Sequence, residues 1–370
     1  MKFTIALVIF YVVCSSKLFS DEPTFKTDTI SIVVEKGESV IDILEKNTTF
    51  DTIQVEDSIS SKIKIDSTNK FTSGVGSSFV TKPYTYAGGK RYTVDGGVPN
   101  SKSSFDFVPA TITVGITTAA CTGLYLYQKN AWWSNNRSSF HIQEDGDYSL
   151  RADKLGHFYG GYVVSYLFGE GMIASGLNLR TAHALGTLGG LLYQTFVEIQ
   201  DGYGSNWGFS PSDAISNYLG AWYYLAQNEI PFLQNFTPKV QFVPSRWAGD
   251  LPMKHETAVF DDYHSMTYHL SIELDNILPN ALRNILPDWL NLSLGYNVRN
   301  MEYFDVQGNS LRESNFVIAL DYNLLKLIPE SDSNFLNWLV QTLNHYKLPS
   351  PAIVIGKEVK FALLFPFLVF

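Results

Sequence analysis

Hydrophobic positions follow two different spacings along this chain, and the change falls near Lys239. Before it, apolar runs at about 108–127, 153–174, 179–199 and 211–227 have the length and composition of helices. After it, apolar and polar residues alternate with a period of two, which indicates strands with one apolar face. The pattern predicts an α+β protein, in which a small bundle of about four helices is followed by a C-terminal antiparallel β-sheet or partial barrel.

The alternation is clearest at 267–274, 289–301 and 314–324. These stretches have about the length of a transmembrane strand, which needs roughly 9–11 residues. The chain ends with the apolar segment 361–370, and this ending resembles the C-terminal signature of bacterial outer-membrane β-barrels. A soluble sheet that covers the helices would give the same alternation, so the pattern leaves both placements open.

The N-terminal part of the chain shows neither spacing. Residues 1–20 have the form of a secretory signal, because Lys2 precedes an apolar run that ends in small residues. Residues 21–104 are rich in polar residues and glycine, which predicts a poorly ordered or β-containing arm. The remaining chain divides into a helical membrane-associated bundle at 105–235 and a β-rich region at 236–370.

The first helical run, Val108–Tyr127, carries no formal charge and is long enough to cross a bilayer. Its threonines make it only moderately hydrophobic, so a partly buried bundle helix is an equally good interpretation. Trp132 and Trp133 follow at once, which is typical of an interfacial belt and also of a buried core. The sequence therefore leaves open whether this helix spans a membrane, and whether that membrane is the inner or the outer one.

Local signals refine the later helices. Ser210 is the expected N-cap of the last helix, with Pro211 at its first position. Glycines four residues apart, at 156 and 160 and again at 186 and 190, share one helix face and would let helices approach closely.

The amino-acid composition bears on the environment of the protein and not on its predicted fold. Charged residues make up 17% of the chain and aromatic residues 14%, whereas an ordinary soluble domain has about 25% charged residues. These values favour a membrane-associated or envelope protein, with membrane lipid or outer-membrane components as partners. The net charge of −9 gives a nucleic-acid partner no electrostatic support.

The chain has two cysteines, Cys14 and Cys121. Cys14 falls within the predicted signal, which leaves at most one thiol in the mature chain and excludes an internal disulfide. Neither cysteine has the spacing of a zinc site. Lipid attachment at Cys14 would need a small residue just before it, and Val13 occupies that position.

Three polar clusters lie at or near the ends of the helical runs, at 153–157, 198–202 and 210–213. Folding the runs into a bundle would bring these clusters together. Carboxylates and a histidine beside apolar helices are costly unless they are paired or bound to something. The candidate side chains are Asp153, Lys154, His157, Glu198, Asp201, Asp213 and Asn217.

Two kinds of chemistry fit these residue types. Asp153 and His157 are four residues apart and share a helix face, so the carboxylate can orient the histidine as a general base. Alternatively, His157, Asp153, Glu198 and Asp213 could bind a hard or borderline divalent cation such as Mg²⁺, Mn²⁺ or Zn²⁺.

A metal is nevertheless not expected, because the same groups can satisfy one another. Lys154 can pair with Glu198 or Asp213, and His157 can donate to a carboxylate, which would give a buried polar network that sets helix register. No serine has the context of a nucleophile elbow, and no cofactor-binding motif is visible.

With these residues identified, the stretch from Phe140 to about Ala226 resembles the YfiM-type family of predicted periplasmic lipoproteins, a bacterial envelope domain of unknown function. A more distant likeness is to VanZ-like membrane proteins, which share an Asp-Lys-x-x-His start. The resemblance implies an envelope location and lipidation, and it implies no reaction. It rests on Asp153-Lys154-x-Gly156-His157, Glu198-x-x-Asp201-Gly202, Trp207-Gly208-Phe209-Ser210, and Ser212-Asp213 followed by Asn217-x-x-Gly220-Ala221.

These observations predict a structural or scaffolding component of the bacterial cell envelope, associated with the outer membrane or with the periplasmic face of a membrane. The alternative is a membrane-associated enzyme, metal-dependent or not, that acts on lipid or cell-wall precursors. The sequence does not decide between an enzyme and a scaffold, and it identifies no protein partner.

Overall fold

The computed structural model describes residues 85–86, 89–94, 96, 107–134, 137–249, 251 and 259–369. They all belong to one compact unit of the chain. The predicted signal, Cys14 and most of the predicted arm lie outside the described residues. From the arm, β1 (Thr85–Tyr86) and β2 (Gly89–Lys90) form a short antiparallel pair. The division into four regions stays a prediction.

Three long helices, α4 (Ala152–Ala174), α5 (Leu179–Gly202) and α6 (Pro211–Glu229), pack against one another and are called the helical region below. Their starts agree with the apolar runs of the sequence. Ser210 caps α6 as predicted, because its hydroxyl accepts a hydrogen bond from the Asp213 backbone N–H. Pro211 occupies the first turn.

Glycine lets α4 and α6 come into backbone contact. A Cβ on Gly220 would lie 1.9 Å from the carbonyl oxygen of Phe158, and one on Gly161 would lie 2.1 Å from that of Asn217. No side chain fits at either position without moving a helix. This contact brings the first turns of α4 and α6 together.

The predicted role of the glycine pairs is confirmed for α5 and corrected for α4. Gly186 and Gly190 stand against the backbone of α4, where a Cβ would clash. In contrast, Gly156 and Gly160 face side chains of other elements. Spacing on one helix does not say which neighbour lies opposite, so the close approach on α4 falls at other glycines.

Helix α3 (Phe107–Gln128) precedes the helical region and continues as a π-helical turn, Lys129–Trp133. In the described part of the chain it is the one helix long and apolar enough to cross a membrane, and only 6% of that window is buried. Trp133, in contrast, is buried against Phe168 and Tyr193. Of the two interpretations that the sequence allowed, a buried core residue and an interfacial one, the first therefore holds for Trp133.

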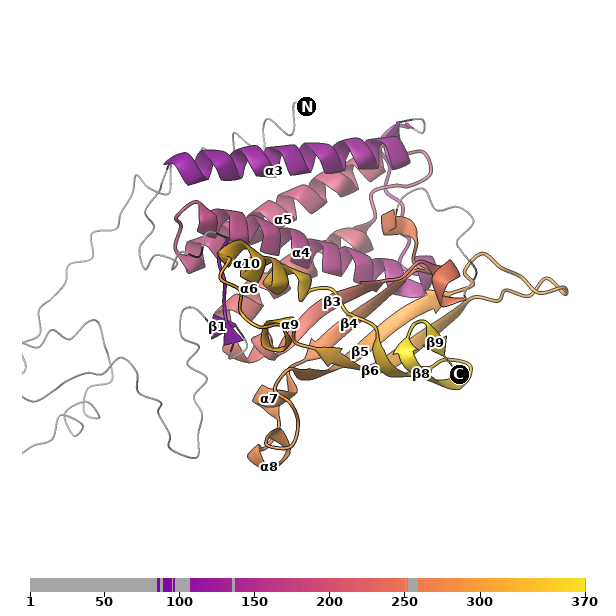
Figure 1. Ribbon diagram of the computed structural model, residues 1–370. Coiled ribbons are helices and arrows are strands. Elements are labelled where there is room, and N and C mark those ends of the chain that lie inside the picture. Colours follow the sequence, from indigo (N-terminus) through magenta and orange to yellow (C-terminus); the bar gives the residue numbers. More distant parts are fainter. Residues whose placement is uncertain are drawn as a thin grey trace, which may run out of the picture. The chain divides into compact units, whose positions relative to one another are not determined.

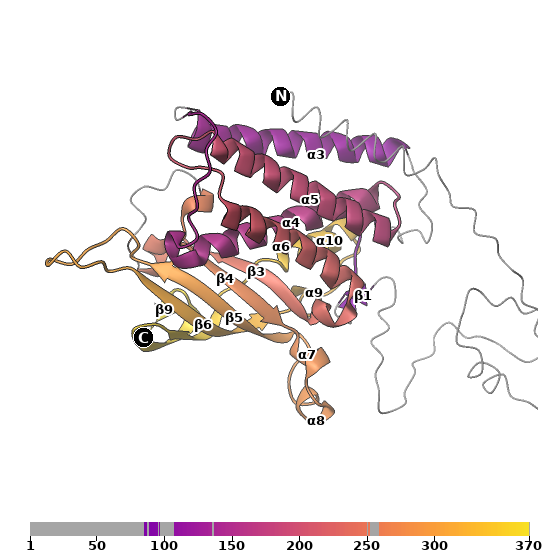
Figure 2. The ribbon, with the colours of Figure 1, turned by 180° about the vertical axis from the view of Figure 1, so that it is seen from behind.

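The C-terminal region forms an open sheet of seven antiparallel strands, whose spatial order follows the chain from β3 to β9 (Figures 1 and 2). The predicted α+β class, with helices before an antiparallel sheet, is thereby confirmed. The strands are β3 (Phe236–Phe242), β4 (Met266–Ile272), β5 (Leu290–Arg299), β6 (Glu313–Tyr322), β7 (Ser350–Ile355), β8 (Val359–Phe365) and β9 (Leu368–Val369).

Short helices fill the connections between these elements. The 3₁₀ turns are Tyr148–Arg151, Pro231–Asn235, Ser245–Ala248 and Val259–Asp261. The α-helical ones are α7 (Leu274–Ile277), α8 (Asn280–Arg283), α9 (Leu324–Leu327) and α10 (Asn334–Leu343).

The end of the chain differs from its prediction. The apolar segment 361–370 suggested one closing strand, but the chain turns after β8 and returns as β9. Pro366 stands at the turn, and proline has no N–H to donate to a strand ladder. Phe370 lies outside the described residues.

Helix α4 joins the helical region to the sheet. Ala152, at its start, packs with Met266 and Tyr268 of β4 and with Val298 of β5. Figures 1 and 2 show the helices on one side of the sheet, with β6 to β9 farther from α4 than β3 and β4. The start of α4 is therefore enclosed by helices and by strands.

Candidate functional site

The three polar clusters of the sequence meet in the folded chain. Asp153 and His157 lie in the first two turns of α4, Glu198 near the end of α5, and Asp213 in the first turn of α6. Because α5 runs back along α4, its C-terminal end lies beside the first turns of α4 and α6, and the three helix ends come together. The carboxylates are buried, with Asp153 3% exposed and Glu198 1% exposed.

His157 lies at the centre of the charged groups. Its Nε2 is 3.4 Å from Asp153 Oδ1 and 3.6 Å from Asp213 Oδ1, and its Nδ1 is 3.3 Å from Glu198 Oε1. The oxygen of the Asn217 amide also lies 3.3 Å from Nδ1. One imidazole therefore contacts groups from all three long helices.

Lys154 makes a second centre beside it. Its ammonium lies 2.6 Å from Asp145 Oδ1 and 2.7 Å from Asp153 Oδ2, and it also donates to Asp213. The predicted pair of Lys154 with Asp213 is confirmed. Glu198 instead accepts a hydrogen bond of 2.7 Å from the Asn217 side chain.

Three more residues, which the sequence interpretation missed, complete the network. Asp145 precedes α4, and its carboxylate binds Lys154. Tyr263 precedes β4, and its hydroxyl donates to Asp153. Trp133 donates its indole N–H to Asp201 over 2.7 Å, so Asp201 is held by the turn after α3. No spacing rule links these residues to the long helices, because Asp145 and Tyr263 come from irregular segments and Trp133 from the π-helical turn after α3.

Burial and close charges change the proton affinity of these groups. Burial acts to lower the pKa of His157, but the carboxylates of Asp153, Asp213 and Glu198 outweigh it and raise the pKa to about 10. Burial also acts to raise the pKa of Asp153, and there His157 and Lys154 prevail and hold it below its usual range. His157 is therefore a cation at neutral pH, paired with an ionised Asp153.

The pKa values of the other carboxyl groups are raised, in contrast to that of Asp153. Burial is the main cause that raises the pKa of Glu198 to about 8, and those of Asp201 and Asp213 to about 7. We call these groups the charge cluster: Asp145, Asp153, Lys154, His157, Glu198, Asp201 and Asp213. The charge cluster holds more carboxyl groups than cations, so protonation removes part of its excess negative charge. A buried group of this kind can exchange protons near neutral pH.

A metal site is geometrically conceivable at the same place. One ligand atom each from Asp153, His157 and Asp213 lie within 4.8 Å of one another. However, the Lys154 ammonium already contacts both of these carboxylates, and a cation would have to displace it. Glu198, which the sequence also suggested as a ligand, is outside this group of three.

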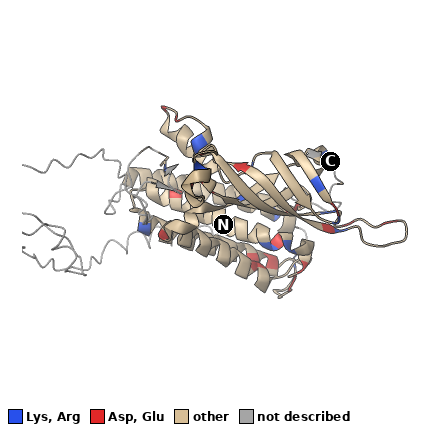
Figure 3. Ribbon diagram, turned by 90° about the horizontal axis from the view of Figure 1, so that it is seen from below, with Lys and Arg blue, Asp and Glu red and all other residues tan. Residues whose placement is uncertain are grey.

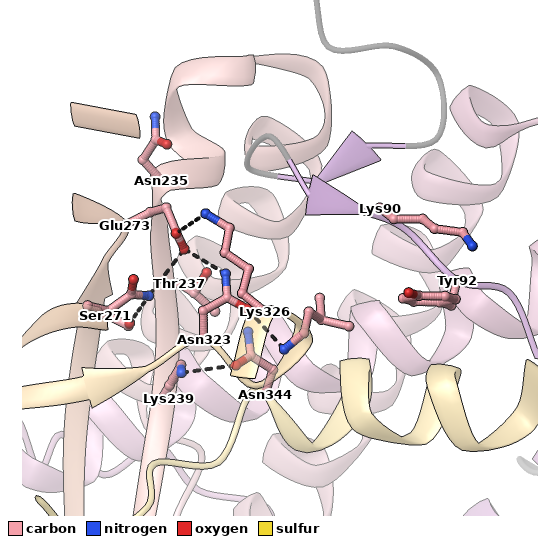
Figure 4. A pocket seen from close by; sticks show the side chains of 12 residues that line it. Lys90, Tyr92, Asn235, Thr237, Lys239, Ser271, Glu273, Asn323, Lys326 and Asn344 are labelled. Atoms are coloured by element: carbon pink, nitrogen blue, oxygen red, sulfur yellow. Dashed lines mark hydrogen bonds and ion pairs between the residues drawn. The ribbon is translucent and has the colours of Figure 1, made fainter. Parts of the chain in front are cut away.

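Three cavities in the described part of the chain lie at the two ends of the sheet and between α4, α6 and α10, and none of them is lined by a residue of the charge cluster. One of about 70 Å³ opens at the ends of β3 to β5, where Glu273 accepts hydrogen bonds from Lys326 and Asn323 (Figure 4). Another, of about 440 Å³, lies at the other end of β5, lined by Arg299 and Asn315 among others. The sequence interpretation named no candidates in either place.

Comparison with known proteins supports the family resemblance over the helical region. Residues 143–227 match the model of a family described as "Predicted periplasmic lipoprotein (DUF2279)". Neither the curated proteins nor the solved structures give a match. The matched range contains all seven predicted site residues and Asp145. The predicted location in the cell envelope is confirmed by this match, and the family is one of predicted periplasmic lipoproteins of unknown function.

Proposed function

We propose that this protein is a non-catalytic structural component of the bacterial cell envelope, associated with the outer membrane, and that the charge cluster holds its parts in register. The observation that carries this proposal is the pairing of Lys154. Its single ammonium joins carboxylates from the segment before α4, from α4 itself and from α6. We include in this proposal the more specific likenesses of the chain to YfiM-type and VanZ-like proteins.

Buried charge is the physical reason for this structural role. An ionised group inside a protein is tolerated when partners compensate it, and it strongly destabilises the fold when a partner is removed. His157 has carboxylates from all three long helices around it, and Asp153 also accepts from Tyr263 next to the sheet. A cluster paired in this way supports helix register and the junction with the sheet.

The test compares folding with chemistry in the same variants. His157→Ala and Asp153→Ala, made in the full chain, should lower the midpoint of thermal unfolding strongly. Neither wild type nor variant should turn over lipid-linked or glycan substrates. Arg180→Ala serves as the matched control, because that arginine side chain is 88% exposed on the same helical region. Turnover by the wild type that His157→Ala abolishes without loss of stability would overturn the proposal.

A second candidate function is a metal-dependent enzyme, favoured by the grouping of Asp153, His157 and Asp213. Mg²⁺, Mn²⁺ and Zn²⁺ can be added in turn to the purified full chain, and bound metal can be measured by elemental analysis after dialysis. Stoichiometric metal that is lost in Asp213→Asn supports the enzyme. A wild type that retains none of the three ions, and whose unfolding midpoint they leave unchanged, supports the structural role.

A further inference from the structure

The two faces of the sheet have the reverse of the polarity found in most soluble sheets. On one face, which we call the outer face, Leu270, Leu294, Ile318, Ile353 and Phe361 form one continuous row across β4 to β8. Each of these side chains is exposed, from 36% at Leu270 to 63% at Phe361. The row is therefore apolar on five successive strands and has no cover in the described chain.

A second row on the outer face repeats the pattern from β6 to β8, while its member on β5, Tyr296, packs against the start of α4. Phe316 of β6 pairs with Tyr296 of β5 and with Ile355 of β7, and Ile355 pairs with Val359 of β8. Phe316 is 62% exposed. The rings of Tyr296 and Phe316 pack edge to face with centroids 5.4 Å apart. The apolar surface thus extends along the strands as well as across them.

The opposite face is buried, and it is polar along β3 to β5 and at the ends of β6, whereas Val317, Ala352 and Val354 belong to a buried apolar cluster on β6 to β8. The Asn315 amide donates to Asn297 over 3.1 Å, and the Asn297 amide donates to Thr267 over 3.3 Å, so a hydrogen-bonded row crosses three strands. Lys239 of β3 and Asp321 of β6, each 1% exposed, form an ion pair of 2.9 Å inside the sheet. The strands keep their charge on this inner face.

This arrangement does not suit water on the outer face. An antiparallel sheet with one solvated face normally turns its polar residues outward. Monomeric soluble proteins rarely expose contiguous apolar patches of more than a few hundred Å². Polar residues inside and apolar residues outside are the alternation of strands that face lipid. Helix α4 covers this face only at one end, where Met266, Tyr268 and Val298 pack.

We propose that the outer face of β4 to β8 contacts the acyl chains of an envelope membrane. The inference deepens the proposed function and rests on it for the choice of a membrane as partner. Charge selects this occupant, because the described outward positions of these five strands carry no charged side chain, which complements an uncharged hydrocarbon layer. Figure 3 shows the strands mostly tan, with charged positions few among them.

Aromatic side chains at one margin of the face agree with this placement. Trp289, just before β5, lies beside Tyr322 at the end of β6, with ring centroids 6.0 Å apart. Tryptophan and tyrosine are enriched where a membrane protein passes from hydrocarbon to headgroups. A second copy of the chain is the competing occupant, and the experiment separates the two.

The test uses the full chain with Cys14 and Cys121 replaced by serine, so that no lipid anchor at Cys14 can account for binding. Single cysteines at Ile318 and Phe361 are labelled with an environment-sensitive fluorophore and mixed with vesicles of phosphatidylethanolamine and phosphatidylglycerol. Val306→Cys is the control, because Val306 is 96% exposed but lies in the loop between β5 and β6.

We expect nitroxide-labelled lipids to quench most of the fluorescence of the labels at 318 and 361, and aqueous iodide to quench little of it. The label at 306 should respond in the opposite way. Quenching of 318 and 361 by iodide in the presence of vesicles overturns the proposal. Protection from both quenchers overturns it as well, because it indicates a protein partner such as a second copy.

A second measurement does not depend on labelling. Phe361→Asp should lower the vesicle-bound fraction in flotation by about tenfold, since a charge on a lipid-facing strand is unfavourable, while Val306→Asp should leave it unchanged. Circular dichroism confirms that each variant is folded. Because α3 can hold the chain on vesicles by itself, equal binding by both variants contradicts the proposal when Phe361→Asp also leaves the lipid quenching of the label at 318 unchanged. Turnover or bound metal at the charge cluster would contradict the proposed function and leave these results unaffected.

Discussion

The helical region and the sheet bury polar groups in different ways. The helical region gathers most of its buried charges where three helix ends meet, with Glu170 paired to Arg91 farther along α4, and it also buries side chains such as Tyr162 and Tyr224. The sheet spreads polar residues over the inner face of β3 to β6, buries a small apolar cluster on the inner face of β6 to β8, and turns further apolar residues outward. The stability of the helical region therefore depends on a few buried ion pairs, whereas the stability of the sheet depends on the lipid or protein that covers its outer face.

The largest expected effect breaks the charge cluster. Lys154→Ala leaves the carboxylates of Asp145, Asp153 and Asp213 without their shared cation, and loss of one partner of a buried pair costs about 3–5 kcal/mol. Arg151→Ala is the matched control, because its ion pair with Asp147 is exposed and such pairs contribute about 0–1 kcal/mol. Urea unfolding measures both. Equal losses would mean that the cluster contributes no more than a surface pair.

A slightly smaller effect is expected from the contact between α4 and α6. Gly220→Ala places a methyl group against the carbonyl oxygen of Phe158, and we expect a loss of about 3 kcal/mol, the upper end of typical overpacking costs. Gly123→Ala in α3 is the control, since a Cβ there has open space. It should be neutral or stabilise by up to about 1 kcal/mol. A tolerated Gly220→Ala would show that the two helices can separate freely.

The sheet should respond differently on its two faces. Asn297→Ala removes the acceptor of Asn315 and the donor to Thr267, both inside the sheet, and should cost about 1–3 kcal/mol. Leu294→Ala, in the same strand but on the outer face, should change stability by about 0.5 kcal/mol or less. Both are measured in detergent by thermal unfolding. The reverse order of effects would mean that the outer face is the packed one.

Titration tests the same charges without a mutation, through the pH dependence of the cluster. The pKa of His157 is raised to about 10 and that of Glu198 to about 8, so both bind protons more tightly in the folded chain. Their contributions are complete below the ordinary pKa of each group and are lost as pH rises through the folded value. Stability should therefore fall from about pH 4.5 to pH 8 through Glu198 and from about pH 6.5 to pH 10 through His157.

The measurement is the urea midpoint across this range, in wild type and in His157→Gln, which should show a weaker decline. Asp153 acts in the other direction, because its pKa is lowered, but its contribution is lost only in acid, outside this range. A wild-type midpoint that is constant from neutral to alkaline pH would contradict the assigned protonation of His157.

Much of the charge cluster could be predicted from the sequence. Asp153 and His157 share a helix face because they are four residues apart, and the positions of Glu198 and Asp213 at helix ends implied their convergence. Asp145 and Tyr263 could not be found in this way. They lie in irregular segments, where no periodicity relates sequence distance to distance in space.

The amino-acid sequence was enough to predict the long helices, the strands β4 to β6 with their apolar face, and the helix ends that carry charge. Only the tertiary structure decided that the apolar face of β4 to β8 points outward and that Lys239 and Asp321 pair inside. The physical reason is that a period of two makes the faces of a strand different without saying which of them the rest of the chain will cover.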